Sequence, residues 1–264
     1  MNEGVFLFSV IASTIVLYMT AWYFVSLEFK RQDVADVAWG LGFVLAAWTA
    51  YALTSLDGAF NVRGILLNTL VTIWGLRLSI HIYARNRKKL EDKRYAVWRE
   101  SWGKWFLLRS YFQGFLLQVF LLMVIVSPVL WVHANNSFPI GVIGIVGVVL
   151  WVVGFFFEAV GDWQLRRHLK NPVNSGLTLM TGLWKYTRHP NYFGEVMQWW
   201  GIWLCVIELP YGWVTIIGPL TITLLIFKVS GISLLERAMA GRADFESYKL
   251  RTSRFFPLPP KKFL

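Results

Sequence analysis

The chain has very little cysteine and histidine, and this scarcity excludes several kinds of site. Only Cys205 is a cysteine among the 264 residues, so neither an intramolecular disulfide nor a thiolate metal cluster is expected. The four histidines are scattered, and no two of them have the spacing of metal ligands on one helix. The strand-to-helix nucleophile motif of serine hydrolases is also missing. We therefore expect neither a catalytic metal nor a hydrolase triad.

Charged residues are scarce as well, at 16% of the chain, while 56% of the residues are hydrophobic and the mean hydropathy is +0.50. Residues 4–27 run for 24 positions without a charge, and about 20 apolar residues suffice to cross a bilayer. The sequence predicts an all-α integral membrane protein, a bundle of about seven transmembrane helices, with a short sixth span that begins near Pro190. Further apolar runs, some short or interrupted by one charge, occupy residues 37–56, 64–84, 110–132, 138–157, 196–207 and 209–227.

The chain has 15 acidic residues against 26 Lys and Arg. The distribution of the basic residues indicates whether this positive charge serves membrane topology or nucleic-acid binding. All but three of the basic residues lie in alternate loops and in the C-terminal tail. The positive-inside rule then predicts a cytosolic C-terminus and an N-terminus outside. Because the charge sets topology, we expect no nucleic-acid partner, and no feature indicates an obligate protein partner. The predicted location is a bacterial inner membrane, or the endoplasmic reticulum in a eukaryote.

The sequence shows neither repeats nor a domain break, so we expect one transmembrane domain over residues 1–264. Within it, residues 1–157 are predicted to supply the substrate-side helices and residues 158–264 the cofactor-binding half. The polar insert 85–109 interleaves aromatic side chains with charges at spacings of three and four residues. This pattern predicts an amphipathic helix on the membrane surface.

Several charged residues fall at membrane depth, where they are costly and therefore suggest function. Asp33 and Asp36 flank the entry to the second span, and Arg77 and His81 are four residues apart on the third. A structural ion pair is the alternative explanation for Asp36 and Arg77. Because nearly all such residues lie toward the cytosolic ends of the spans, we expect one polar layer around a cavity that opens to the cytosol.

The stretch GLWKYTRHPNYFGE, residues 182–195, predicts an anion site at a helix start. Pro190 suits the first position of a helix, where its missing N–H costs nothing. Arg188 and His189 stand just before this helix, whose free N–H groups favour a phosphate or carboxylate. The remaining polar side chains of the stretch would face the same ligand, namely Tyr186, Asn191, Tyr192 and Glu195.

This stretch, with the upstream DWQLRRHLKNP and the downstream KVSGISLLE and FESYKLRTSRFFPLPP, resembles the C-terminal half of the steroid 5-alpha-reductase family, in particular its bacterial-type branch of uncertain substrate. The segment WGLRLSIHIYARNR at 74–87 resembles it more weakly. The resemblance implies a bundle of about seven helices that holds NADPH, and hydride transfer to an enone double bond of a lipid. It further implies cofactor contacts from Asp162, Arg166, Tyr186, Asn191, Glu195 and Tyr248, with Arg85 and Asn86 as weaker candidates. We add Arg188, His189 and Tyr192 from the helix-start argument, and Glu236 from the LLER stretch.

The substrate half departs from that family, because the Gln–Glu pair of the characterised steroid reductases is absent. Asp33 and Asp36 occupy a plausible equivalent place, and Arg77 and His81 would face them from the third span. Asp36 is the first candidate for the proton donor, since a buried carboxyl group can stay protonated at neutral pH. His81 is the second, because imidazole titrates near neutrality.

A second resemblance competes with the first. Membrane methyltransferases of the isoprenylcysteine carboxyl type have a similar Tyr, Arg-His-Pro and Gly stretch and use S-adenosylmethionine. The spacing here departs by about one residue from that of either family, and Glu236 stands alone where the methyltransferases favour a pair. We expect an NADPH-dependent oxidoreductase acting on the CH–CH group of a lipophilic substrate that enters from the bilayer. The alternatives are a lipid methyltransferase that uses S-adenosylmethionine and a non-catalytic lipid-binding membrane protein.

Overall fold

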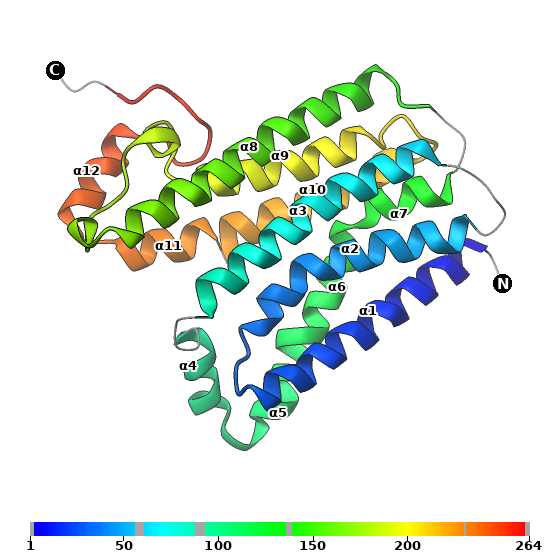
Figure 1. Cartoon of the computed structure of the whole chain (residues 1–264), viewed down its shortest axis with the longest axis horizontal. Helices are drawn as coiled ribbons and strands as arrows, with labels where there is room; N and C mark the ends of the chain where they lie inside the picture. Colours follow the sequence, from blue (N-terminus) through cyan, green and yellow to red (C-terminus); the bar gives the residue numbers. More distant parts are fainter. Residues whose placement is uncertain (1–2, 56–60, 88–92, 136–138, 230, 262–264) are drawn as a thin grey trace. The chain divides into compact units, whose positions relative to one another are not determined.

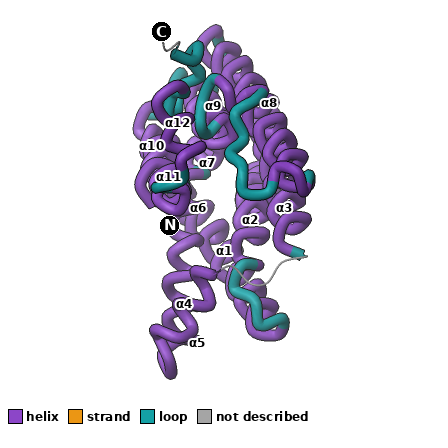
Figure 2. Tube along the Cα trace, turned by 90° about the vertical axis from the view of Figure 1, so that its left-hand side faces the viewer, coloured by secondary structure: helices purple, strands orange, loops and turns teal. Residues whose placement is uncertain are grey.

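The computed structural model describes residues 3–55, 61–87, 93–135, 139–229 and 231–261. In these ranges the chain consists of helices joined by loops (Figure 2), with one isolated β-bridge between Thr187 and Ser253 and no strand. The all-α prediction is therefore confirmed. The chain divides into two compact units, and each is described by itself. Unit 1 contains residues 1–140 and 209–217, and unit 2 contains residues 141–208 and 218–264.

Six helical stretches in the described part of the chain are long and apolar enough to cross a membrane, as in a multi-pass membrane protein. The helix at the predicted sixth span does begin at Pro190, but its 15 residues make it shorter than these six. The six stretches are Gly4–Glu28, Val34–Thr54, Val62–Asn86, Val97–Ile125, Val142–Lys170 and Gly212–Met239.

In unit 1, the long helices α1, α2 and α3 form a packed group (Figure 1). Helices α2 and α3 cross where Gly40 faces Gly75, because a Cβ atom on Gly40 would lie 2.6 Å from the Gly75 carbonyl oxygen. Close by, the Ser79 hydroxyl donates to the Val37 carbonyl oxygen at 2.8 Å. The helices of this unit are α1 (Glu3–Glu28), α2 (Val34–Thr54), α3 (Val62–Asn86), α4 (Lys93–Trp102), α5 (Phe106–Arg109), α6 (Leu117–Ile125) and α7 (Ser127–Ala134), with 3-10 turns at Gly103–Trp105 and Gly212–Ile216 and a π-helix at Ser110–Leu116.

The predicted surface helix over 85–109 is only partly found. Helix α3 continues to Asn86, and a helix starts again at Lys93. Residues 88–92 lie outside the described residues. The four-residue spacing of Trp98 and Trp102 lets their rings stack, with the ring centres 4.9 Å apart.

Unit 2 is built on two long helices, α8 and α9, which run side by side (Figure 1). Loops carrying short 3-10 turns connect α8 to α9, and a π-helix lies between α10 and α11. The elements are α8 (Val142–Lys170), α9 (Pro190–Leu204), α10 (Ile217–Leu224), α11 (Ile232–Met239) and α12 (Ala243–Arg251), with 3-10 turns at Pro172–Asn174 and Gly182–Lys185 and the π-helix at Leu225–Val229.

Glycines line the contact between α8 and α9, and we call this contact the glycine seam. Gly147 faces Gly201, and a Cβ atom on Gly147 would lie 2.4 Å from the Gly201 carbonyl oxygen. Seven residues along α8, Gly154 faces Gly194, where the corresponding distance is 2.6 Å. The pairing order makes the two helices antiparallel. Small residues let helix backbones approach closely in a membrane, where packing replaces the hydrophobic effect.

The glycine seam continues past these pairs to the start of α9. A Cβ atom on Gly161 would lie 3.2 Å from the Asn191 nitrogen and from Cγ of Pro190. At the opposite end, the Glu208 carboxylate accepts hydrogen bonds from the N–H groups of Gly141 and Ile143, at 3.0 and 3.3 Å, and so caps α8. The start of α9 is therefore fixed against the last third of α8.

The glycine seam predicts that alanine destabilises the protein at a seam glycine and not at a glycine with free space around it. In Gly154→Ala the added methyl group would overlap the Gly194 carbonyl oxygen, so the helices must separate, and we expect a loss of about 1–3 kcal/mol in the free energy of unfolding. Gly114→Ala is the matched control, because a Cβ atom there meets nothing within 4 Å. Thermal unfolding of both variants in detergent measures the difference. Equal midpoints for Gly154→Ala and the wild type would contradict the close approach.

Candidate functional site

The segment that precedes α9 is held by the C-terminal tail. The Arg188 backbone N–H donates to the Ser253 carbonyl oxygen at 2.9 Å, and the Thr187 hydroxyl donates to the Phe255 carbonyl oxygen at 2.7 Å. The Leu258 N–H donates to the Tyr186 carbonyl oxygen at 3.0 Å. These bonds give groups of the segment before α9 partners in the tail. They fix the direction in which Arg188 and the next residues point.

Glu236 on α11 is the centre of a charged cluster. Its carboxylate accepts a hydrogen bond from Arg188 Nε at 2.9 Å and pairs with Arg254 Nε at 3.1 Å. His189 Nε2 lies 3.2 Å from the same carboxylate. Burial lowers the pKa of His189, although its hydrogen bond to Glu236 opposes that shift. With a neutral imidazole the cluster holds two positive charges and one negative charge, so its net charge is positive.

Arg188 also connects three segments of unit 2. Besides its bond to Glu236, its Nη1 group donates to the carbonyl oxygens of Thr252 and Lys249, at 2.7 and 3.2 Å. These carbonyls end α12, and a basic group is favourable at a helix C-terminus. Only about a tenth of the Arg188 side chain is exposed. Arg188 therefore has a structural role, and its predicted contact with a cofactor stays a prediction.

Two polar pairs lie on the glycine seam. Asn191 Nδ2 donates to Asp162 Oδ1 at 3.0 Å, and Gln198 Nε2 donates to Glu158 Oε2 at 2.6 Å. Asp162 and Asn191 were both candidates from the sequence, and the structure brings them together. Gln198 was missed, although it follows Asn191 by seven residues and so lies on the same face of α9. Asn191 Oδ1 is buried and has no partner among the described residues.

The remaining candidates of unit 2 differ in how far their side chains are buried. Glu195 is half-buried one turn after Asn191, while Arg166 is exposed one turn after Asp162. Tyr192 stacks on His189 with ring centres 5.8 Å apart.

Two candidate tyrosines differ in exposure. Tyr248 is buried, and burial raises its pKa. Its hydroxyl donates to the Trp184 carbonyl oxygen and, at 3.4 Å, to that of Thr187. It therefore supports the segment before α9. Tyr186, by contrast, exposes its ring.

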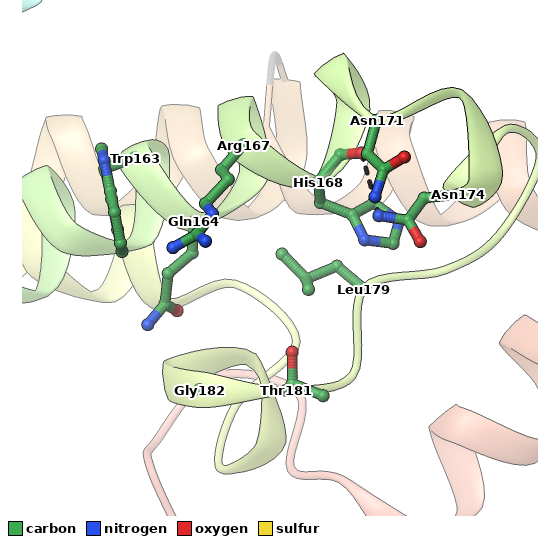
Figure 3. Close-up of a pocket in the computed structure, with 9 residues that line it drawn as sticks. All are labelled: Trp163, Gln164, Arg167, His168, Asn171, Asn174, Leu179, Thr181 and Gly182. Carbon is green, nitrogen blue, oxygen red and sulfur yellow. Dashed lines mark hydrogen bonds between the residues drawn. The ribbon is translucent and has the colours of Figure 1, made fainter.

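A polar pocket of about 350 Å³ lies beside α8, and no sequence argument anticipated it (Figure 3). Its α8 wall includes Trp163 and Arg167, with the guanidinium carbon 5.6 Å from the indole centre. The Leu183 N–H donates to Gln164 Oε1 at 3.0 Å, which ties the segment after Gly182 to α8. The pocket offers stacking and hydrogen bonding to a polar ring. The other lining residues are His168, Asn171, Asn174, Leu179, Thr181 and Gly182.

The four catalytic candidates belong to unit 1. Both oxygens of Asp33 are engaged by Arg31, whose Nη2 and Nε lie at 2.7 and 3.0 Å. Asp36 is half-buried in the first turn of α2. The bond from Ser79 to Val37 places the first turn of α2 beside the Ser79 turn of α3, and the predicted facing of Asp36 with Arg77 and His81 stays a prediction.

The other unit 1 candidates lie along α3. Arg77 and His81 are half-buried there. Near the end of α3, Arg85 Nε donates to Asn86 Oδ1 at 3.0 Å. Arg85 and Asn86 thus lie in unit 1, and the other cofactor candidates lie in unit 2. Within the described ranges, three or more His, Cys, Asp or Glu side chains nowhere gather as metal ligands would.

Residues 22–252 match a family described as protein of unknown function, DUF1295. The chain belongs to the DUF1295 family. This family member is also 26% identical over 164 residues to an uncharacterized protein of Schizosaccharomyces pombe, a match that covers 54% of this chain. The chain matches 48% of that relative's length. No solved structure matches this DUF1295 protein.

The His189 contact predicts how stability depends on pH. Because the pKa of His189 is lowered in the folded state, the unfolded chain takes up a proton at a higher pH than the folded chain. This contribution to stability is complete above about pH 6.5 and is lost as the pH falls below it, with a slope of at most ~1.4 kcal/mol per pH unit. We expect His189→Gln to reduce the slope between pH 6.5 and 5 in thermal unfolding. An unchanged slope would show that His189 is not held neutral.

Proposed function

We propose that this DUF1295 protein is a membrane-embedded, NADPH-dependent reductase that acts on a conjugated carbon–carbon double bond of a lipophilic substrate. The observation that carries the proposal is the arrangement at the start of α9. There, Asp162 and Asn191 are joined beside a positively charged cluster, and the helix N-terminus has no side-chain cap.

The groups left over at this site fit an anionic nucleotide. Asn191 Oδ1 is a buried acceptor without a partner, and the first turn of α9 offers backbone N–H groups with the positive end of the helix dipole. Nearly half of the Arg254 side chain is exposed, so its guanidinium reaches solvent while Nε holds Glu236. This charge distribution supports the proposal that Arg166, Arg254 and the start of α9 would bind the phosphates.

The resemblance of residues 158–260 to steroid 5-alpha-reductases supports a nicotinamide nucleotide, because Asp162, Arg166, Asn191 and Glu195 stand at its cofactor positions. Bound NADPH would supply a hydride. Asp162 would orient the Asn191 amide, which keeps its free oxygen for a donor on the cofactor. Glu195, one turn further along α9, would accept a hydrogen bond from a hydroxyl or an amide group.

The candidates for the acid are residues of unit 1. Arg31 engages both oxygens of Asp33, so neither oxygen is available to deliver a proton to a substrate. Asp36 therefore stays the first candidate for polarising the substrate carbonyl and protonating the enolate, with His81 as the second. General acid catalysis of this kind contributes about 10²–10⁴-fold to a rate.

Thermal unfolding with separately titrated nucleotides tests the proposal. We expect NADPH to raise the unfolding midpoint of the detergent-purified protein, since a ligand at a hundred times its dissociation constant adds about 2.7 kcal/mol. Asn191→Asp should abolish the shift, because it places a second carboxylate beside Asp162. Asn135→Asp, at the residue that follows α7, is the control for the same change of charge. Stabilisation by S-adenosylmethionine alone would contradict the proposal and make the protein a methyltransferase.

Asp36→Asn separates binding from chemistry in the same preparation. The variant should keep the full stabilisation by NADPH, because Asp36 is assigned to the substrate. It should lose turnover of an enone lipid by about the 10²–10⁴-fold expected for a general acid. Normal turnover by Asp36→Asn would remove that residue from the mechanism and leave the nucleotide site intact.

A further inference from the structure

A second cavity lies wholly in unit 1, at the end of its three long helices. Its volume is about 280 Å³, at the small end of the range for ligand pockets. Its wall is mostly apolar, and its rim carries charged and amide groups. The apolar lining consists of Trp22, Val25, Phe29, Val34, Val37 and Tyr83, and the polar lining of Arg31, Asp33, Asn86 and Arg87.

The rim lies where three membrane-length helices end. Helix α1 ends at Glu28, α2 begins at Val34 and α3 ends at Asn86. The apolar lining residues of α1 precede this level, and exposed Phe29 and Tyr83 stand beside it. In a bilayer the rim is therefore at headgroup depth, and the apolar wall faces the acyl chains.

A strained turn directs Arg31 into the rim. Lys30 has a left-handed backbone with φ of 54°, which is unusual for a residue with a side chain. The Lys30 N–H returns to the Leu27 carbonyl oxygen and the Arg31 N–H to that of Ser26, at 3.2 and 2.9 Å, so α1 ends in a Schellman motif. Beyond its pair with Asp33, Arg31 Nη2 donates to the Asn86 carbonyl oxygen at 3.1 Å. The turn thus ties the start of α2 to the end of α3.

The charges of the rim do not cancel. Asp33 is the one acid among the lining residues, and Arg31 neutralises it with two hydrogen bonds. Arg87 takes part in none of the ion pairs within the described ranges, and its side chain is exposed at the rim. Arg85, two residues earlier on α3, adds a further positive charge at the same helix end. The lining as a whole therefore carries one excess positive charge beside an apolar recess.

We propose that this cavity binds an anionic phospholipid of the surrounding leaflet, with one acyl chain in the apolar recess and the phosphate group at Arg87. A basic pocket between membrane helices on the cytosolic side suits an acidic headgroup. A zwitterionic lipid such as phosphatidylcholine would bring a choline cation with its phosphate, so the excess positive charge of the lining would stay uncompensated. This proposal rests on residues of unit 1 alone and does not depend on the proposed reductase activity.

Lipid titration of the delipidated, detergent-purified full chain tests the site. The probes are dioleoyl phosphatidylglycerol, dioleoyl phosphatidylcholine with the same acyl chains, and glycerol phosphate as the headgroup alone. We expect saturable stabilisation by phosphatidylglycerol, at least tenfold weaker apparent binding of phosphatidylcholine, and none by glycerol phosphate. The phosphatidylglycerol effect should weaken as salt is raised from 50 to 500 mM, because exposed charges are screened.

Two variants and a control locate the effect. Arg87→Gln should weaken phosphatidylglycerol binding at least tenfold while its lipid-free unfolding midpoint stays at the wild-type value, because the side chain is exposed. Val37→Trp should weaken both lipids by filling the recess. Arg109→Gln, an exposed arginine outside the cavity, is the matched control and should bind as the wild type does. Equal stabilisation by both lipids, equal binding by Arg87→Gln and the wild type, or full stabilisation by glycerol phosphate would each overturn the proposal.

Discussion

The close approach of α8 and α9 is the constraint on which the site of unit 2 depends. Gly147 and Gly154 face Gly201 and Gly194 with no room for a Cβ atom on either side. Only at this separation can short side chains bridge the helices, since the amide of Asn191 must reach Asp162 directly. A wider spacing would let lipid or water enter and would leave Glu158 and Gln198 unpaired in an apolar surrounding, which is costly. The glycine seam therefore positions the polar pairs as well as the backbone.

The charged cluster around Glu236 compensates a carboxylate that is largely buried. A carboxylate with a side chain only 16% exposed needs compensation, and Arg188, His189 and Arg254 supply it from two other segments. The same bonds hold α11, the tail and the segment before α9 together, and so they fix the position of the cluster. Its net positive charge therefore stays beside the uncapped N-terminus of α9. Structure and proposed ligand binding share these residues, so substitutions at Arg188 or Glu236 would alter both at once. Asn191 is the more selective position, because its free oxygen holds nothing in the described structure.

Local sequence signals predicted the features that depend on neighbouring residues. Long apolar runs predicted the membrane helices, and Pro190 predicted the start of α9, because both signals act within one helix. The pairing of Asp162 with Asn191 was consistent with the family resemblance that named both residues. The glycine seam was not recognised, although Gly147, Gly154 and Gly161 recur at seven-residue intervals. The role of Glu236 also escaped the sequence, since its partners come from the segment before α9 and from the tail. The pocket beside Trp163 escaped it because the loop after α8 returns to that helix only in the folded chain.

Amide hydrogen exchange with and without NADPH would locate the proposed nucleotide site of this DUF1295 protein, because amides covered by a bound nucleotide exchange more slowly. We predict that NADPH slows exchange in residues 186–195 and in the α8 segment around Asp162, while S-adenosylmethionine leaves both unchanged. Protection confined to other segments, or protection of residues 186–195 by S-adenosylmethionine and not by NADPH, would contradict it.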